Sequence, residues 1–261
     1  MKKFYCLFFT LLFFSVCSAF SADMKFVQID NLMFSSSNQQ SIDNLENILQ
    51  DINKQKDVEF IVFSGNNIAK PNTEDLESFL IRIKKIKTPC YFILGNKDVN
   101  KYKNLGKNEY VKLLQKNIKS HKKITSSNYV FEKNKMVFIV VDGSKEVFPN
   151  SMGYYKSDVL DWLEEQLIKY SDRKVVILQH FPLIPPAKRE SHYTFKANEY
   201  LELLSTNNNV LAVISGHFGV NKEVEQNGIM HLSAPAAPSY KIIEILNYDS
   251  ENPEFWSITK Q

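Results

Sequence analysis

Short apolar runs alternate with amphipathic segments along most of this chain. The continuous apolar runs have the length of buried strands and lie at 24–29, 59–63, 90–94, 174–179 and 210–215. Apolar residues at helical spacing predict helices at 42–52, 73–86, 157–170 and 196–204. Buried strands that alternate with helices are typical of an α/β protein with a largely parallel central sheet.

The second half of the chain adds strands of another kind. Segments 128–132 and 136–141 predict a hairpin around a polar turn, and 228–234 and 240–246 have the pattern of antiparallel strands. The chain contains no internal repeat, low-complexity linker or break in composition. We therefore expect one domain that spans residues 22–261.

The first 21 residues have the pattern of a secretory signal peptide. Lys2 and Lys3 precede an apolar run at 4–17, and small residues around Ser21 provide a cleavage site. A membrane anchor is the alternative, but the run is shorter than the roughly 20 apolar residues that a spanning helix needs. We expect export to the periplasm or the medium, with no membrane span after cleavage.

Composition narrows the classes of partner. The 261 residues carry a net charge of +3, and without the two lysines of the signal segment 30 basic side chains face 29 acidic ones. No basic stripe stands out, so nucleic acid is not indicated as a partner. Of three cysteines, only Cys90 follows the signal segment, and it lies in an apolar strand as a buried residue would.

Polar turns follow five of the predicted strands. They are Asp30-Asn31, Gly65-Asn66, Gly95-Asn96-Lys97-Asp98, Gln179-His180 and Gly216-His217. Each alone is an ordinary turn. Ligands of open α/β sheets bind beyond the carboxyl ends of the strands, so the five together predict a binding site at that edge.

The order and spacing of these turns resemble the calcineurin-like metallophosphoesterase family. The family pattern is Asp-x-His, Gly-Asp, Gly-Asn-His-Asp/Glu, His-x-Pro and Gly-His-x-His. The segments "VFSGNNIAKP" and "GYYKSDVLDWLEEQL" extend the similarity, which covers about residues 24–246. The resemblance implies an α/β fold, a four-layer α/β/β/α sandwich of two packed mixed sheets.

The resemblance also implies which residues have changed at one metal position. In the family, that metal is held by the Asp and His after the first strand, the bridging Asp and the last His. Those places are taken here by Asn31, Met33, Asn66 and Gly219. Asp30 comes one residue too early, and strand alternation predicts that its side chain points away from the site.

The ligand set of the second metal position is better preserved. It corresponds to Asn66, Asn96, His180 and His217, in which only the bridging carboxylate has become an amide. Lys97 stands where the family has the histidine that assists the substrate.

These replacements change the chemistry that the site can support. A carboxylate bridges two cations with two anionic oxygens, whereas an amide offers one neutral oxygen and an NH2 group that repels a metal. Lys97 adds a positive charge nearby. We therefore expect no dinuclear metal pair, and at most one Zn2+ or Mn2+ on Asn66, Asn96, His180 and His217.

Three functional hypotheses follow. The first is a non-catalytic protein that binds a small phosphorylated or anionic ligand with Lys97, Asn31, Asn66 and Asn96. The second is a mononuclear phosphoester hydrolase in which Lys97 and Asp98 are the candidate catalytic residues, although a salt bridge to Lys97 or a turn-closing hydrogen bond is the favoured role for Asp98. The third is a structural or interaction protein whose cleft has no role, and no protein partner is indicated.

Overall fold

The computed structural model describes residues 23–103 and 105–261. The signal segment expected at 1–21 lies outside the described residues. Among the helices of the described residues, none is both long and apolar enough to cross a bilayer.

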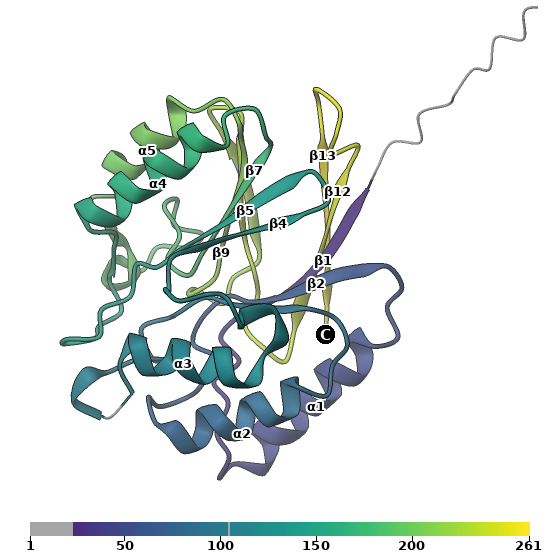
Figure 1. The fold of residues 1–261 in the computed structure, drawn as a ribbon, viewed down its shortest axis with the longest axis vertical. Coiled ribbons are helices and arrows are strands. Elements are labelled where there is room, and N and C mark those ends of the chain that lie inside the picture. Colours follow the sequence, from purple (N-terminus) through teal and green to yellow (C-terminus); the bar gives the residue numbers. More distant parts are fainter. Residues whose placement is uncertain (1–22, 104) are drawn as a thin grey trace, which may run out of the picture.

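The first sheet has five strands in the order β13-β12-β1-β2-β3. β1 (Met24–Ile29), β2 (Val58–Phe63) and β3 (Cys90–Phe92) run parallel. β12 (Tyr240–Leu246) pairs antiparallel with β1, and β13 (Glu254–Lys260) pairs antiparallel with β12. The first and last described strands of the chain therefore belong to the same sheet (Figure 1).

The second sheet has six strands, and β5, β7, β9 and β11 of this sheet run parallel. In spatial order the strands are β10 (Lys222–Gln226), β11 (Ile229–Ser233), β9 (Val210–Ser215), β7 (Val175–Gln179), β5 (Met136–Val141) and β4 (Tyr129–Lys133). A separate two-stranded ribbon joins β6 (Gly153–Tyr154) to β8 (Thr194–Phe195).

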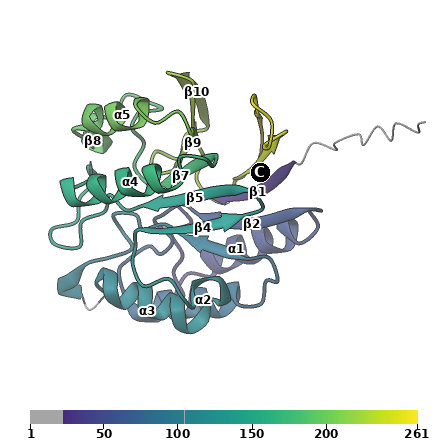
Figure 2. The ribbon, with the colours of Figure 1, turned by 45° about the horizontal axis from the view of Figure 1, so that its top comes forward.

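Helices cover the outer face of each sheet. α1 (Gln39–Ile52), α2 (Thr73–Ile83) and α3 (Lys107–Asn117) lie on the first sheet. α4 (Ser157–Lys169) and α5 (Ala197–Ser205) lie on the second (Figure 2). The predicted four-layer sandwich of two mixed sheets is therefore confirmed.

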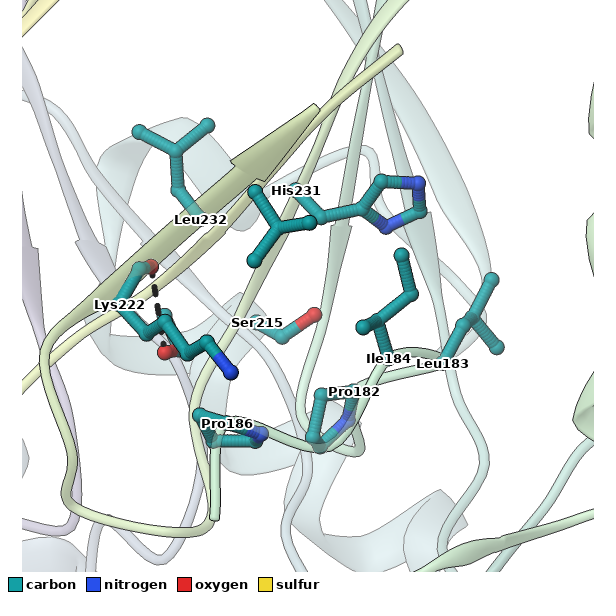
Figure 3. Close-up of a pocket in the computed structure, with 10 residues that line it drawn as sticks. Pro182, Leu183, Ile184, Pro186, Ser215, Lys222, His231 and Leu232 are labelled. Carbon is teal, nitrogen blue, oxygen red and sulfur yellow. Dashed lines mark hydrogen bonds between the residues drawn. The ribbon is translucent and has the colours of Figure 1, made fainter. Parts of the chain in front are cut away.

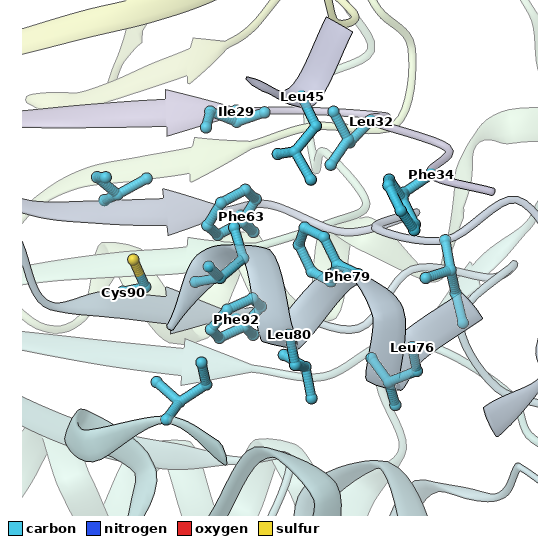
Figure 4. Close-up of a cluster of buried hydrophobic side chains, with 14 of the residues drawn as sticks. Ile29, Leu32, Phe34, Leu45, Phe63, Leu76, Phe79, Leu80, Cys90 and Phe92 are labelled. Atoms are coloured by element: carbon cyan, nitrogen blue, oxygen red, sulfur yellow. The ribbon is translucent and has the colours of Figure 1, made fainter. Parts of the chain in front are cut away.

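Three apolar clusters separate the four layers. Between the sheets, the rings of Phe26 and Phe60 stack at 4.7 Å, and Phe138 of the other sheet meets Phe60 edge-on at 4.9 Å. Beneath α2, Phe79 packs against Phe63 of β2 (Figure 4). Because these strands are covered on both faces, they read as continuous apolar runs in the sequence.

Some elements depart from the sequence pattern. α2 ends at Ile83 and does not continue to residue 86, and β3 ends at Phe92 because the chain then turns toward the site. The pattern does not predict α3, whose apolar residues are diluted by lysine, or the edge strand β13, which exposes Trp256 and Ile258. The prediction that Cys90 is buried is confirmed, with 2% of its surface exposed.

A buried histidine makes stability depend on pH. His121 ends the short 3-10 helix Lys119–His121, and its ring packs against the rings of Tyr91, Phe92 and Tyr129. Within the described residues its Nε2 has no hydrogen-bond partner. Burial lowers the pKa of His121 to about 3.

Acid should therefore destabilise the fold partly through His121. Below about pH 6.5 the unfolded chain takes up a proton at this ring and the folded chain does not, down to about pH 3. The free energy of unfolding should fall by up to about 1.4 kcal/mol per pH unit for this group. In His121→Phe, urea unfolding at pH 6.5, 5.5 and 4.5 should show a correspondingly shallower slope. Equal slopes in the variant and the wild type would contradict this account.

Candidate functional site

The turns that follow the strands of both sheets meet at one cleft of about 350 Å3. Its lining residues are Asn31, Met33, Asn66, Asn96, Lys97, Ser151, Arg189, His192, His217, Phe218, Gly219 and Ala236. The structure thus brings together Asn31, Asn66, Asn96, Lys97 and His217 of the predicted site. His180 and Asp98 are fully buried and do not line the cleft.

A chain of amide hydrogen bonds forms one wall of the cleft. Asn66 donates from Nδ2 to Oδ1 of Asn31 at 2.9 Å, and its Oδ1 accepts the backbone N–H of Lys97 at 2.9 Å. Asn31 and Asn66 have φ values of 49° and 52°, a left-handed conformation that asparagine tolerates better than most residues. The NH2 group and the oxygen of the Asn66 side-chain amide therefore each have a protein partner.

Asp98 fixes two of the turns beneath the cleft. Its carboxylate accepts hydrogen bonds from the backbone N–H groups of Asn67, Ile68 and Gly95, at 2.7, 3.1 and 2.8 Å. It also accepts one from Nδ2 of Asn67 at 3.2 Å. Burial raises the pKa of Asp98 to about 7, and these N–H groups act in the opposite direction. Asp98 thus joins the turns after β2 and β3, and three of these four hydrogen bonds come from the turn after β2.

Asp30 is fully buried and does not line the cleft, but its carboxylate contacts the site residues from below. Its carboxylate accepts the backbone N–H of His217 at 3.2 Å, Nδ2 of Asn31 at 2.8 Å and the hydroxyl of Ser64 at 3.1 Å. Asp30 directly follows β1 and forms an isolated parallel bridge with Ala236. Burial raises the pKa of Asp30 well above its usual range.

His180 and His217 face each other with nitrogens that both carry lone pairs. Nδ1 of His180 lies 2.7 Å from the carbonyl of Ser64, and Nε2 of His217 lies 2.8 Å from the carbonyl of Ser151. A carbonyl only accepts, so both of these nitrogens carry the proton. Burial lowers the pKa to about 4 for His180 and about 2 for His217, so both rings are neutral at pH 7. The remaining nitrogens lie 3.1 Å apart without a proton between them.

The turn after β2 leaves room for this histidine pair. Gly65 has φ +103°, and a Cβ added there would lie 2.3 Å from Nδ1 of His180. A side chain at this position would displace the ring, so glycine is required both for the backbone and for the packing.

Several nitrogen and oxygen atoms at this site could act as metal ligands. Two imidazole lone pairs converge, and Oδ1 of Asn96 is buried without a hydrogen-bond partner among the described residues. These atoms suit one cation that prefers nitrogen ligands. No group of three or more His, Cys, Asp or Glu side chains in the described part of the chain could hold a metal. The residues present therefore do not fit two metal ions.

Positive charge gathers on the open side of the cleft. Lys97 and Arg189 are exposed, and no carboxylate among the described residues pairs with either side chain. The guanidinium of Arg189 lies over the ring of Phe218 at 5.9 Å, and the ring of His192 packs against His217 at 4.8 Å. None of the described residues that line the cleft is acidic.

Sequence reasoning did not find Arg189. It lies in the long connection between β7 and β8, and no local pattern marks this basic residue as part of the cleft. The basic pair Lys188-Arg189 was the available signal, but only the folded path of the loop shows which of the two faces the cleft.

A second cavity lies beside β9 and β11 and does not belong to the cleft. It is lined by Pro182, Ile184, Ser215, Lys222 and His231, among others (Figure 3). Its volume of about 10 Å3 is close to that of one water position, so it cannot hold a ligand. His231 is buried here.

Comparison with known proteins gives a consistent result. The model of a family described as calcineurin-like phosphoesterase matches residues 27–221. A probable glycerophosphodiester phosphodiesterase GpdQ of Arcobacter nitrofigilis is 28% identical over 207 residues, which is 74% of this chain and 68% of that protein. Similar solved structures include a dimetal phosphatase from Danio rerio, with 15% identity, a TM-score of 0.67, and 91% and 99% of the two chains covered. Another is GAP50, the anchor in the inner membrane complex of Plasmodium, with 16% identity, a TM-score of 0.61, and 92% and 90% covered. At these identities the two structures show the fold alone.

Proposed function

Because this chain belongs to the calcineurin-like phosphoesterase family, we propose that its cleft binds a phosphate or carboxylate group without the family's pair of metal ions. The observation that carries this proposal is the pair of cations, Lys97 and Arg189, in a cleft without an acidic lining residue. Both cations lack a carboxylate partner within the described residues, so an anionic ligand would supply one.

The two cations have complementary properties. Arg189 presents a planar fork of N–H donors that suits two oxygens of one phosphate or carboxylate group. Lys97 acts as a point charge, and the hydrogen bond from its backbone N–H to Asn66 fixes where its side chain begins. Asn96, Ser151 and His217 line the same cleft with polar groups that carry no negative charge.

Hydrolysis by the two-metal route of the family is not part of this proposal. That route needs two cations about 3.5–4 Å apart. Its four ligand positions on one side are occupied here by Asn31, Met33, Asn66 and Gly219, and the amide oxygen of Asn66 already accepts the backbone N–H of Lys97.

A second candidate function rests on the facing histidines. The converging lone pairs of His180 and His217 favour a single Zn2+ or Mn2+, which would act as a Lewis acid on a phosphoester. His180, His217 and Asn96 are the residues that would hold the ion.

Inorganic phosphate binding tests the main proposal. Calorimetric titration should show binding that weakens about 10- to 100-fold in Lys97→Ala and in Arg189→Ala, because each substitution removes a charge-assisted hydrogen bond worth about 1.5–3 kcal/mol. Lys188→Ala is the matched control, since this exposed lysine precedes Arg189 and does not line the cleft. The proposal fails if phosphate, pyrophosphate and citrate all leave the wild type without measurable binding, or if Lys97→Ala binds them as well as the wild type does.

A further inference from the structure

A second pocket lies on the other side of Lys97 and shares a wall with the cleft. Asn96, Lys97 and Ser151 line both spaces. The second pocket measures about 360 Å3, and Lys70 and Lys103 are among its other lining residues. The two pockets are therefore adjacent, and the pair, called the groove below, is together large enough for a metabolite-sized molecule.

The second pocket carries more basic side chains than the cleft. It adds Lys70 and Lys103 to Lys97, and none of its lining residues within the described chain is acidic. Neither Lys70 nor Lys103 has an ion-pair partner among the described residues. The whole groove thus carries four cations, and uncompensated like charges repel one another and attract anions.

Ordered backbone places these lysines. Lys70 follows Ala69, whose N–H donates to the carbonyl of Phe34 at 2.8 Å. Lys103 ends the 3-10 helix Lys101–Lys103, and its own N–H donates to the carbonyl of Asn100 at 3.0 Å. Their side chains therefore start from fixed points at the rim of the pocket.

We propose that the groove binds a small molecule with two separate phosphate groups, one held by Lys97 and Arg189 and the other by Lys70 and Lys103. This inference rests on the proposed function of the cleft and extends it to a second subsite. A phosphate monoester carries a charge of about −1.5 to −2 at neutral pH, so two such groups balance the four cations. One phosphate would leave two lysines uncompensated.

Linking two phosphate groups in one molecule makes the contribution of the second subsite to the affinity measurable. Once the first phosphate is bound, the second meets its subsite as an intramolecular partner, at an effective concentration in the millimolar range for a short flexible spacer. A subsite made of exposed lysines binds free phosphate weakly, but it adds to the affinity of a tethered phosphate.

A series of spacers tests the inference without knowledge of the natural ligand. The probes are alkanediol bisphosphates with two to six methylene groups, each compared with its monophosphate by calorimetric titration at fixed salt. At least one bisphosphate should bind the wild type at least about 10-fold more tightly than its monophosphate. Lys70→Gln/Lys103→Gln should lose that advantage and keep the monophosphate affinity. Arg189→Gln should weaken both kinds of probe.

The matched control is Lys101→Gln, because Lys101 belongs to the same 3-10 helix as Lys103 and does not line the pocket. The inference is overturned if no bisphosphate exceeds its monophosphate by more than the statistical factor of about two. It is also overturned if the advantage survives in Lys70→Gln/Lys103→Gln. Either result with monophosphate binding intact leaves the proposed function standing, whereas no binding of any probe ends both.

Discussion

Asp98→Ala is expected to lower the free energy of unfolding by about 4 kcal/mol. The substitution leaves the backbone N–H groups of Asn67, Ile68 and Gly95 without an acceptor in a fully buried place, whereas the amide of Asn67 keeps the carbonyl of Ile93 and the hydroxyl of Tyr110. Each unsatisfied buried donor costs about 1–3 kcal/mol, although relaxation and entering water reduce the sum. Because Asp98 joins the turns that carry Asn66 and Lys97, phosphate binding should weaken as well.

Urea unfolding at pH 7.5 measures this effect, and Asp98→Asn refines it. Asparagine keeps an oxygen for the N–H groups of Asn67 and Ile68, but its NH2 faces the N–H of Gly95, so the loss should be about half as large. Asp172→Ala is the control, since Asp172 is exposed and should change stability by less than about 0.5 kcal/mol. A loss below about 1 kcal/mol in Asp98→Ala would show that Asp98 does not hold the turns together.

Asn66→Asp should have opposite effects on metal binding and on stability. The new carboxylate adds an anionic ligand for an ion held by the two facing histidines. We expect the affinity for Zn2+ to rise about 100-fold, the effect of a few kcal/mol of attraction at an effective dielectric near 20. Without metal, the new carboxylate opposes Oδ1 of Asn31, which now accepts from Asn66. Stability should then fall by about 1–3 kcal/mol.

Zn2+ titration with mass spectrometry and urea unfolding in EDTA measure the two effects. The wild type should bind at most one Zn2+ per chain, and His180→Ala/His217→Ala should bind none at this place. Asn47→Asp, on the exposed face of α1, is the matched control. Two Zn2+ ions per wild-type chain would contradict the proposed loss of the metal pair.

The fold could be predicted well from the sequence because its strands are covered on both faces. Runs such as 136–141 are apolar at every position, and their order with the intervening helices leaves few topologies. The sequence pattern does not predict α3 or β13, for the opposite reason. Each buries only part of its surface, so lysines in α3 and exposed Trp256 in β13 weaken the periodic signal.

The site could be predicted only as far as it lies next to strand ends. Asn31, Asn66, Asn96, Lys97 and His217 follow strands and do line one cleft. The pattern could not show that His180 lies beneath His217, because that depends on how the two turns pack. Arg189 comes from a long loop, and its place is fixed by tertiary contacts that a single sequence does not encode locally.

The amide chain from Asn31 through Asn66 to the backbone of Lys97 has an evolutionary consequence. Each link pairs a donor with an acceptor, so the two asparagines suit each other better than either suits an aspartate. Introducing one aspartate at a time passes through a less stable intermediate, whereas introducing both together requires a cation to separate their charges. Such epistasis entrenches the present pair. A lineage with these two asparagines would acquire the family's aspartates more readily where the surroundings supply abundant divalent metal.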